Sequence, residues 1–427
     1  MLIARRIVPL MMLIGLAILA YYSILSALAD VSFRENNLAA LRRAVALVPA
    51  NAAYHALLAE HQEAAGENPD RELEIATELS PRESRYWVRR SFRAEIERNY
   101  ADSEKFLVTA TRVDRGFDPR WALMNFYFRR GRTPEFWKAA KEALEMSYDD
   151  LSPIFRLCLA TNDDPQATRL VLPARRGILR AFFVWLIQNR PVESSKALAD
   201  ELASSSGPED LPVLADYCDR QLGRDNESAL AVWNTLCRRK LLPFRELAPG
   251  NGLVVTNGNF SAEPSNRGFD WRFGADQFAV MSRPDGDKGI SIDINGRQPD
   301  RLILLEEDIP LSPGRKYAVT VDYDLAGDQS DSGLHLLVAG GPAGETNTDD
   351  PIATSAVFST QDQGTERITF QALKREVARL QLEYRRTAGT IRWKGAVRVH
   401  RVISALAQPL PAESDSIPLR AAARVLP

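Results

Sequence analysis

The pattern of apolar and polar positions changes twice along the chain, and these changes divide it into regions. Residues 7–29 form an unbroken apolar stretch, residues 31–248 repeat apolar positions at spacings of three and four, and residues 250–405 alternate apolar with polar positions. These patterns are typical of a membrane-spanning helix, of amphipathic helices and of half-buried strands. The sequence therefore predicts a multidomain chain, α then β. It comprises an N-terminal transmembrane helix, an α-helical repeat array, a C-terminal antiparallel β-sandwich or jelly roll, and a flexible tail over residues 406–427.

Residues 1–30 are expected to be a membrane anchor or a signal segment. Arg5 and Arg6 precede the apolar stretch and Asp30 follows it. The excess of positive charge at the start places that end in the cytoplasm, so the remainder of a single-pass protein is extracytoplasmic, in the periplasm beyond the inner membrane. A cleaved signal peptide stays open as the alternative, because the A-x-A sequence of residues 27–29 resembles a cleavage site.

Aromatic residues recur at a fixed period within the helical region. Tyr54, Trp87, Trp121 and Phe155 stand 33, 34 and 34 positions apart when the segments around them are aligned. This period is close to the length of about 34 residues expected for a tetratricopeptide unit. We expect each aromatic to pack between helices, since large aromatic rings dominate cores.

The helical region resembles degenerate tetratricopeptide repeats in its layout. Each unit has a proline or polar turn, an aromatic early in the first helix, a second turn and a second helix; the second turns fall at Gly66, Asn99 and Gly131. The resemblance implies a stacked array whose concave groove binds a protein partner.

After residue 249 the period changes from about 3.6 to 2. In the segment RKYAVTVDYDLAG, Tyr317, Val319 and Val321 fall on one face, while Thr320 and Asp322 fall on the other. Similar alternation recurs downstream, with turn pairs such as Asn-Gly and Pro-Gly between the runs. Many short strands with such turns are typical of a sandwich or jelly roll.

Three segments of this region resemble jelly-roll carbohydrate-binding modules. They are NGNFSAEPSNRGFDWRF (257–273), LSPGRKYAVTVDYD (311–324) and GTIRWKGAVRVHRV (389–402). The whole arrangement, with an anchor, degenerate repeats and a sandwich opening on GFDWR, also resembles proteins of bacterial exopolysaccharide and exosortase gene neighbourhoods. The first resemblance implies glycan binding, and the second implies a role beside surface polysaccharide without a known reaction.

Composition and motifs exclude several function classes. A net charge of -2 gives no broad basic field for nucleic acid. The sequence contains no nucleotide-loop, zinc-protease or nucleophile-elbow motif, and three dispersed cysteines form neither a zinc site nor a disulfide framework. Modules of the resembled kind often bind structural calcium, but Lys394 and Gly395 stand where the last strand commonly carries an aspartate. We therefore expect no cofactor and no metal.

Sugar binding requires aromatic faces that stack on pyranose rings, with polar groups beside them. The candidate aromatics are Trp271, Tyr384 and Trp393, with Asp270, Arg272 and Arg385 as polar partners. A core position remains open for each aromatic. An alternative is a glycan-modifying enzyme with a divergent site, for which Asp322 and Asp324 offer two carboxylates on one strand face.

These patterns together predict a membrane-tethered, extracytoplasmic, non-catalytic scaffold of polysaccharide assembly or export. The repeats would hold a protein and the sandwich would contact glycan. A sandwich that only docks protein is the further alternative.

Overall fold

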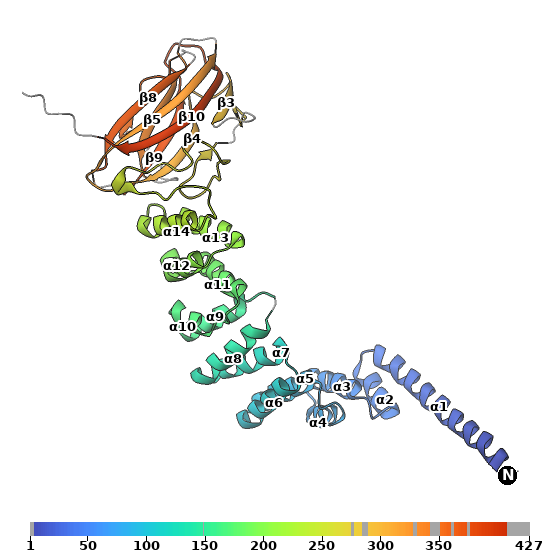
Figure 1. Cartoon of the computed structure of the whole chain (residues 1–427). Coiled ribbons are helices and arrows are strands. Elements are labelled where there is room, and N and C mark those ends of the chain that lie inside the picture. Colours follow the sequence, from blue (N-terminus) through green and yellow to red (C-terminus); the bar gives the residue numbers. More distant parts are fainter. Residues whose placement is uncertain are drawn as a thin grey trace, which may run out of the picture. The chain divides into compact units, whose positions relative to one another are not determined.

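The structure is a computed structural model (Figure 1). It describes residues 4–147, 149–274, 277–283, 289–327, 331–341, 351–359, 363–373 and 376–407. From residue 408 onward, the predicted flexible tail lies outside these ranges. The chain divides into two compact units, Met1–Phe182 and Phe183–Pro427, the second of which contains the last helices together with all the strands. The predicted domain limits at residues 248 and 250 stay predictions.

The first half of the described chain is helical, as predicted. Its helices are α1 Ala4–Arg34, α2 Leu38–Leu47, α3 Ala52–Ala64, α4 Asp70–Leu79, α5 Ser84–Ile96, α6 Tyr100–Val113, α7 Phe117–Arg129, α8 Thr133–Met146, α9 Ser152–Thr161, α10 Pro165–Val171, α11 Arg176–Asn189, α12 Lys196–Ser204, α13 Leu211–Gln221 and α14 Asn226–Arg238. Three short 3-10 turns are Val192–Ser195, Pro208–Asp210 and Pro249–Asn251.

Short polar side chains start several of these helices. The side chains of Asn37, Asn51, Asn99, Asp164 and Asp225 each accept a hydrogen bond from a backbone N–H in the first turn of α2, α3, α6, α10 and α14 respectively. Such caps satisfy donors that have no partner within the helix. These five helices therefore begin where the sequence supplies a capping residue.

The repeat aromatics are not equally buried. Tyr54 and Phe155 lie in the core, whereas Trp87 and Trp121 are half-buried at the helix surface. The Trp87 ring lies 6.0 Å from the ring of Phe106, and its indole N–H donates to a backbone carbonyl. The expectation of packing between helices is met fully at two of the four positions.

The segment Met11–Arg34 of α1 is long and apolar enough to cross a membrane, with a mean hydropathy of 2.1; a signal sequence would meet the same criteria. The last turns of α1 pack on the first helices of the array. Ala29 is fully buried in a cluster with Ala44 and Tyr54, and Phe33 packs against that cluster. The apolar helix thus continues without a break into the folded array.

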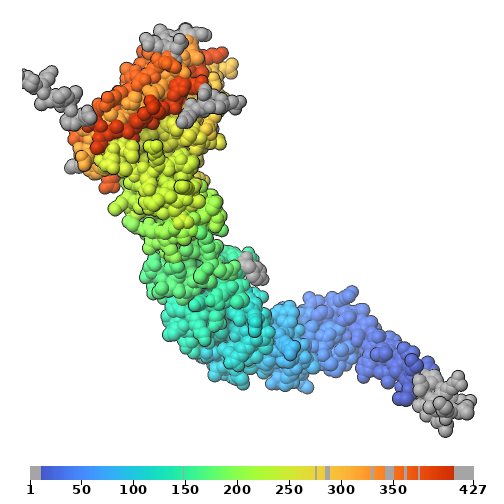
Figure 2. Space-filling view, in the orientation of Figure 1, coloured from blue at the N-terminus to red at the C-terminus, as the bar shows by residue number. Residues whose placement is uncertain are grey.

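The strands are β1 Arg272–Phe273, β2 Ala279–Ser282, β3 Ile290–Asn295, β4 Arg301–Pro310, β5 Lys316–Gly327, β6 Leu334–Gly340, β7 Ala353–Thr354, β8 Gly364–Gln371, β9 Val377–Arg385 and β10 Lys394–Leu406. They form two five-stranded antiparallel sheets, in the orders β1-β4-β9-β6-β7 and β2-β3-β10-β5-β8. In Figure 2 the red atoms of β10 cross the visible face of the sandwich. Every pair of neighbouring strands in these sheets is antiparallel, so the predicted antiparallel sandwich is confirmed.

Both sheets contribute to one apolar core. Leu380, Leu382 and Tyr384 of β9 belong to the same buried cluster as Val319 and Val321 of β5. Alternate positions along each strand supply these side chains, as period two requires. The remaining positions of each strand therefore point away from the core.

Candidate functional site

The outward positions of β9 carry polar side chains that are nevertheless buried. Ala378, Leu380, Leu382 and Tyr384 point into the sandwich, so Arg379, Gln381 and Glu383 point to the opposite face by strand alternation. Gln381 and Glu383 have no exposed surface, and Arg379 has 6%. Charged side chains are almost never this buried unless they are paired. This face therefore differs from an ordinary solvated strand face.

Strand β4 supplies the matching side chains. Glu306 lies opposite Gln381, and Asp308 lies opposite Arg379, whereas Glu307 lies opposite Leu380 and so points into the core. Directly paired residues share a face of an antiparallel sheet. We call the outward set the polar face; its members are Arg272, Arg301, Glu306, Asp308, Arg379, Gln381 and Glu383.

Ion pairs link the members of the polar face across strands. The Asp308 carboxylate accepts from Arg272 at 3.0 Å and from Arg379 at 3.3 Å. Glu306 lies 3.7 Å from the Arg379 guanidinium and accepts from the Gln381 amide at 3.0 Å. Because these side chains are largely buried, their contacts are stronger than the same pairs would be at the surface.

The end of the polar face is built around Glu383. Its carboxylate accepts from the Arg301 guanidinium, and Arg385 lies 3.5 Å from it. The two arginines share this one buried carboxylate, so the negative charge of Glu383 is compensated within the protein.

Two polar atoms of the face make no hydrogen bond to the residues that the structure describes. They are Nη2 of Arg379, a donor, and Oε1 of Gln381, an acceptor. A buried polar atom without a partner costs about 1–3 kcal/mol. A hydroxyl group donates and accepts at once, so a polyol or ordered water can satisfy both atoms. The described polar face carries no aromatic ring, so contact there would be made by hydrogen bonds without ring stacking.

Two further carboxyls are buried beneath this face. Glu307 accepts from the backbone N–H of Thr256 at 2.5 Å, and Asp270 accepts from that of Ser265 at 2.7 Å. Burial raises the pKa of Glu307 well above its usual range, against the effect of the Thr256 hydrogen bond, and the nearby Asp270 raises it further. Burial also raises the pKa of Asp270 and of Asp308. Burial thus shifts the pKa of each of these three carboxyls upward, most strongly for Glu307.

The three aromatic candidates for sugar contact do not line a surface. Trp271, Tyr384 and Trp393 are each 1% exposed and belong to the sandwich core. The Trp271 indole N–H donates to the Thr256 carbonyl at 3.0 Å, and its ring packs 5.4 Å from that of Phe260. A ring enclosed on both faces cannot stack on a pyranose. Their proposed role in stacking is therefore corrected: all three hold the two sheets together.

The three polar candidates for sugar contact lie in different surroundings. Asp270 is fully buried and fixes the loop before β1, Arg272 joins the polar face, and Arg385 is half-exposed beside Glu383. The structure brings Arg272 and Arg385 to one sheet but gives neither an aromatic partner among the described residues. Sequence reasoning missed Arg379 and Gln381, because the opposing charges of β4 lie some 70 residues away.

The segment 267–272 contacts the last helix pair rather than a ligand surface. The Asp219 carboxylate of α13 accepts from the Gly268 N–H at 2.6 Å and from Arg272 at 2.9 Å. The ring of Phe269 packs 5.9 Å from that of Trp233 on α14. This turn fixes α13 and α14 to the sandwich.

The carboxylate pair considered for catalysis contacts basic side chains of β10. Asp322 accepts from Arg401 at 2.8 Å, and Asp324 lies 2.6 Å from His400.

No group of three or more His, Cys, Asp or Glu residues suited to a metal occurs in the described ranges. Beside the first strand segment, Arg283 donates to the backbone carbonyls of Phe260 and Ser261 at 3.1 and 3.0 Å. The Arg283 guanidinium therefore binds two carbonyl oxygens that could otherwise be ligands of a cation.

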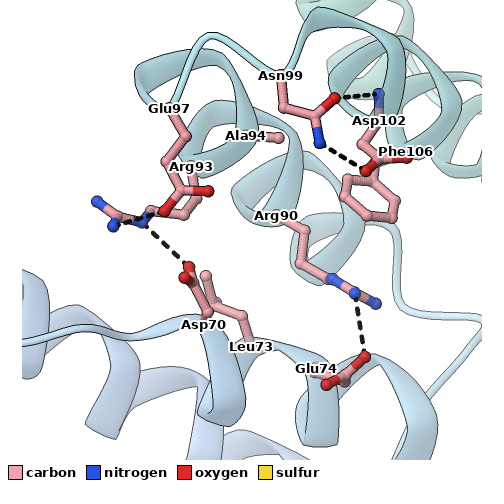
Figure 3. A pocket seen from close by; sticks show the side chains of 10 residues that line it. All are labelled: Asp70, Leu73, Glu74, Arg90, Arg93, Ala94, Glu97, Asn99, Asp102 and Phe106. Atoms are coloured by element: carbon pink, nitrogen blue, oxygen red, sulfur yellow. Dashed lines mark hydrogen bonds and ion pairs between the residues drawn. The ribbon is translucent and has the colours of Figure 1, made fainter.

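A small hollow of about 190 Å³ lies among α4, α5 and α6 (Figure 3). Its two arginines are already paired: Arg93 contacts Asp70 at 3.1 Å, and Arg90 lies 3.5 Å from Glu74 and stacks on Phe106. Because internal carboxylates balance both charges, the hollow offers no free cation to an anionic ligand. It is part of the packing between helices.

No protein-family model and no curated protein matches the chain. Its β-sandwich resembles a solved carbohydrate-binding module of the CBM4 type, at 14% identity and a TM-score of 0.28, covering 36% of this chain and 99% of that one.

Two larger solved structures are also similar. One is the enzymatically active domain of tailspike protein 4 of bacteriophage CBA120, at 13% identity and a TM-score of 0.24, covering 38% of this chain and 22% of that one. The other contains the CBM22-1 and GH10 modules of endo-1,4-β-D-xylanase 10B of Clostridium thermocellum, complexed with xylohexaose. It is 13% identical with a TM-score of 0.22, and the match covers 33% of this chain and 26% of that one.

Proposed function

We propose that this chain is a membrane-anchored, extracytoplasmic, non-catalytic scaffold of surface polysaccharide assembly or export. In this proposal the sandwich binds glycan on its polar face, and the helical array, built of tetratricopeptide-like units, binds a protein partner. The observation that supports the glycan part is the pair of unpartnered atoms on the polar face, the Nη2 donor of Arg379 and the Oε1 acceptor of Gln381. Both atoms are buried, so a polyol reaches them only when the groups that cover this face move aside. Polyols present hydroxyls that complement such a pair.

The non-catalytic part is supported by the state of the carboxylates. Hydrolysis of a glycosidic bond requires two carboxyls that face the substrate, one of them an acid. Asp322 and Asp324 are tied to Arg401 and His400, and the buried Glu307 points into the core. The raised pKa of Glu307 would suit an acid, but a side chain within the core cannot reach a sugar bond.

An uncleaved anchor is supported by the packing of α1. Cleavage after residue 29 would remove Ala29 from its buried cluster and would make the backbone nitrogen of Asp30 a new charged amine. Asp30 accepts a hydrogen bond from the Tyr54 hydroxyl, and burial together with Asp30 raises the pKa of Tyr54 to about 12. An anchor that is retained keeps these contacts, whereas a cleaved signal peptide would expose them.

A protein partner for the array is supported by apolar side chains left exposed on α5. Phe92 is 44% exposed and Ile96 is 64% exposed, and they lie one turn apart on one helix face. Beside Phe92 a hollow of about 120 Å³ is lined by residues of α3, α4 and α5. Adjacent apolar side chains on a repeat array are suited to binding a partner helix or strand.

Electrophoresis of the full chain in detergent through gels containing soluble polysaccharides tests the glycan part. We expect retardation by at least one polymer and no release of reducing ends. If no surface polysaccharide of the source organism changes the mobility, the proposal of glycan binding is wrong. If the protein degrades the polymer that retards it, the alternative of a glycan-modifying enzyme is favoured.

Intact-mass measurement of the membrane-extracted protein tests the anchor. We expect residues 1–29 to be retained and the protein to stay in the membrane pellet after alkaline carbonate treatment. A mature chain that begins at Asp30 would show that the segment is a signal peptide.

A further inference from the structure

A continuous series of contacts runs from helix α13 to the two free atoms of the polar face. It begins at Asp219, whose Oδ1 accepts from Nη2 of Arg272 at 2.9 Å. Arg272 is only 17% exposed and also donates to the Gly268 carbonyl at 2.8 Å, so its position is fixed by the turn that contacts the helices. The first link therefore joins the helical part of this unit to the sandwich.

The second link is a carboxylate shared by two guanidiniums. Nη1 of Arg272 lies 3.0 Å from Oδ2 of Asp308, and Nε of Arg379 lies 3.3 Å from Oδ1 of the same group. Asp308 is fully buried, so neither arginine can exchange it for water. A change in the ion pair between Arg272 and Asp308 must therefore change the ion pair between Asp308 and Arg379.

The third link ends at the free atoms. Glu306 accepts from Nε2 of Gln381 at 3.0 Å and lies 3.7 Å from Arg379. Glu306 therefore fixes which amide atom of Gln381 faces away from it, and that atom is the unpartnered Oε1. The donor of Arg379 and the acceptor of Gln381 are both oriented by this series of contacts.

We propose that Asp219 of α13 is a positioning residue for the glycan-binding polar face, acting through Arg272 and Asp308. This inference rests on the proposed glycan function of that face. Without the Asp219 charge, Arg272 has Asp308 as its one remaining carboxylate within 3.0 Å in the described residues, so Asp308 moves toward Arg272 and holds Arg379 less firmly. By linkage, glycan bound to the polar face alters α13 in return. Movement of the last helix pair would thus regulate glycan affinity.

The first test requires no glycan. Hydrogen–deuterium exchange is measured by mass spectrometry on the full chain in detergent, for wild type, Asp219→Asn and the control Asp216→Asn. Asp216 lies one turn earlier on α13 and pairs with Arg220 and Arg267. Arg267 also lies 4.0 Å from Asp219, but neither it nor Asp216 takes part in the contacts that run from Arg272 to Gln381.

We expect Asp219→Asn to speed exchange in β4 and β9 relative to β5 and β10 of the other sheet, and Asp216→Asn to leave that ratio unchanged. A general loss of stability would speed exchange in all four strands alike. Faster exchange confined to α13 and residues 265–273, or shared by both sheets, would overturn the inference.

The second test measures affinity, with soluble xylan and alginate as probes. Asp219→Asn should weaken retention by whichever polymer binds about five- to tenfold, at the low end of the usual range for coupling between sites. The effect should disappear in an Arg379→Lys background, because Lys lacks the free guanidinium donor. Equal weakening in both backgrounds, or no weakening, contradicts the inference. If neither polymer binds wild type, glycan binding fails for these probes, and hydrogen exchange alone decides the role of Asp219.

Discussion

Gly268 lies directly against the indole of Trp233: a Cβ on Gly268 would stand 2.4 Å from Cζ3 of that ring. Gly268 also has a φ of +56°, in the left-handed region where glycine is favoured. Two independent constraints therefore require glycine at this position, and both arise where the sandwich meets α14. The GFDWR turn is a structural joint between helices and strands.

Replacement of Gly268 by alanine should destabilise the second compact unit. We expect a loss of about 2–5 kcal/mol, the sum of overpacking against Trp233 and the cost of a left-handed alanine. Urea unfolding followed by tryptophan fluorescence measures it. Gly250→Ala is the matched control, since a Cβ there has no atom within 4 Å. A loss no larger than that of the control would show that the joint can relax.

Glu307→Gln should stabilise the protein increasingly as pH rises. Burial raises the pKa of Glu307 in the folded state, so its proton is bound more tightly there than in the unfolded chain. The folded protein is then favoured below the unfolded pKa of about 4.3, and this advantage is lost as pH rises through the folded pKa. Glutamine keeps the neutral form at every pH.

Thermal unfolding midpoints of wild type and Glu307→Gln between pH 4 and pH 9 measure this effect. The difference should be small at pH 4 and should widen toward pH 9. Glu63→Gln, at an exposed carboxyl, is the control and should show no such trend. A constant difference across the range would mean that Glu307 is not buried as a neutral acid.

A photoreactive amino acid at position 96 should cross-link the protein partner of the array. Ile96 is 64% exposed beside Phe92, so the substitution should change the unfolding free energy by less than about 0.5 kcal/mol. Position 85, whose side chain is 77% exposed on the same helix, is the control. One discrete adduct at 96 and none at 85 is the expected result; identical patterns at both positions would argue against a site on α5.

Much of the fold follows from local pattern. Period two in KYAVTVDYDLAG predicted a strand there, and β5 covers it; spacings of three and four predicted the helices of residues 31–248. The half-exposure of Trp87 and Trp121 was not predictable, because a common period does not show how deeply each helix pair packs on the next.

The residues of the candidate site could be predicted from the sequence only in small part. Trp271 and Trp393 satisfy equally the patterns of a core residue and of a sugar contact, and only the facing sheet shows that they are enclosed. Arg379 and Gln381 can be recognised as part of a buried polar cluster only through their contacts with Asp308 and Glu306 on β4. The turn residues in the sequence do not show which distant strands pair. Buried charge becomes recognisable only once the register is known.

The central claim is that the polar face binds glycan through Arg379 and Gln381. Affinity electrophoresis of full-length wild type, Arg379→Lys, Gln381→Met and the opposite-sheet control Asp322→Asn tests it most directly, in a gel containing the polysaccharide that retards wild type. We expect both polar-face variants to lose about tenfold in affinity while Asp322→Asn matches wild type, with thermal midpoints confirming that each variant is folded. Folded polar-face variants that are retarded as strongly as wild type would contradict the claim.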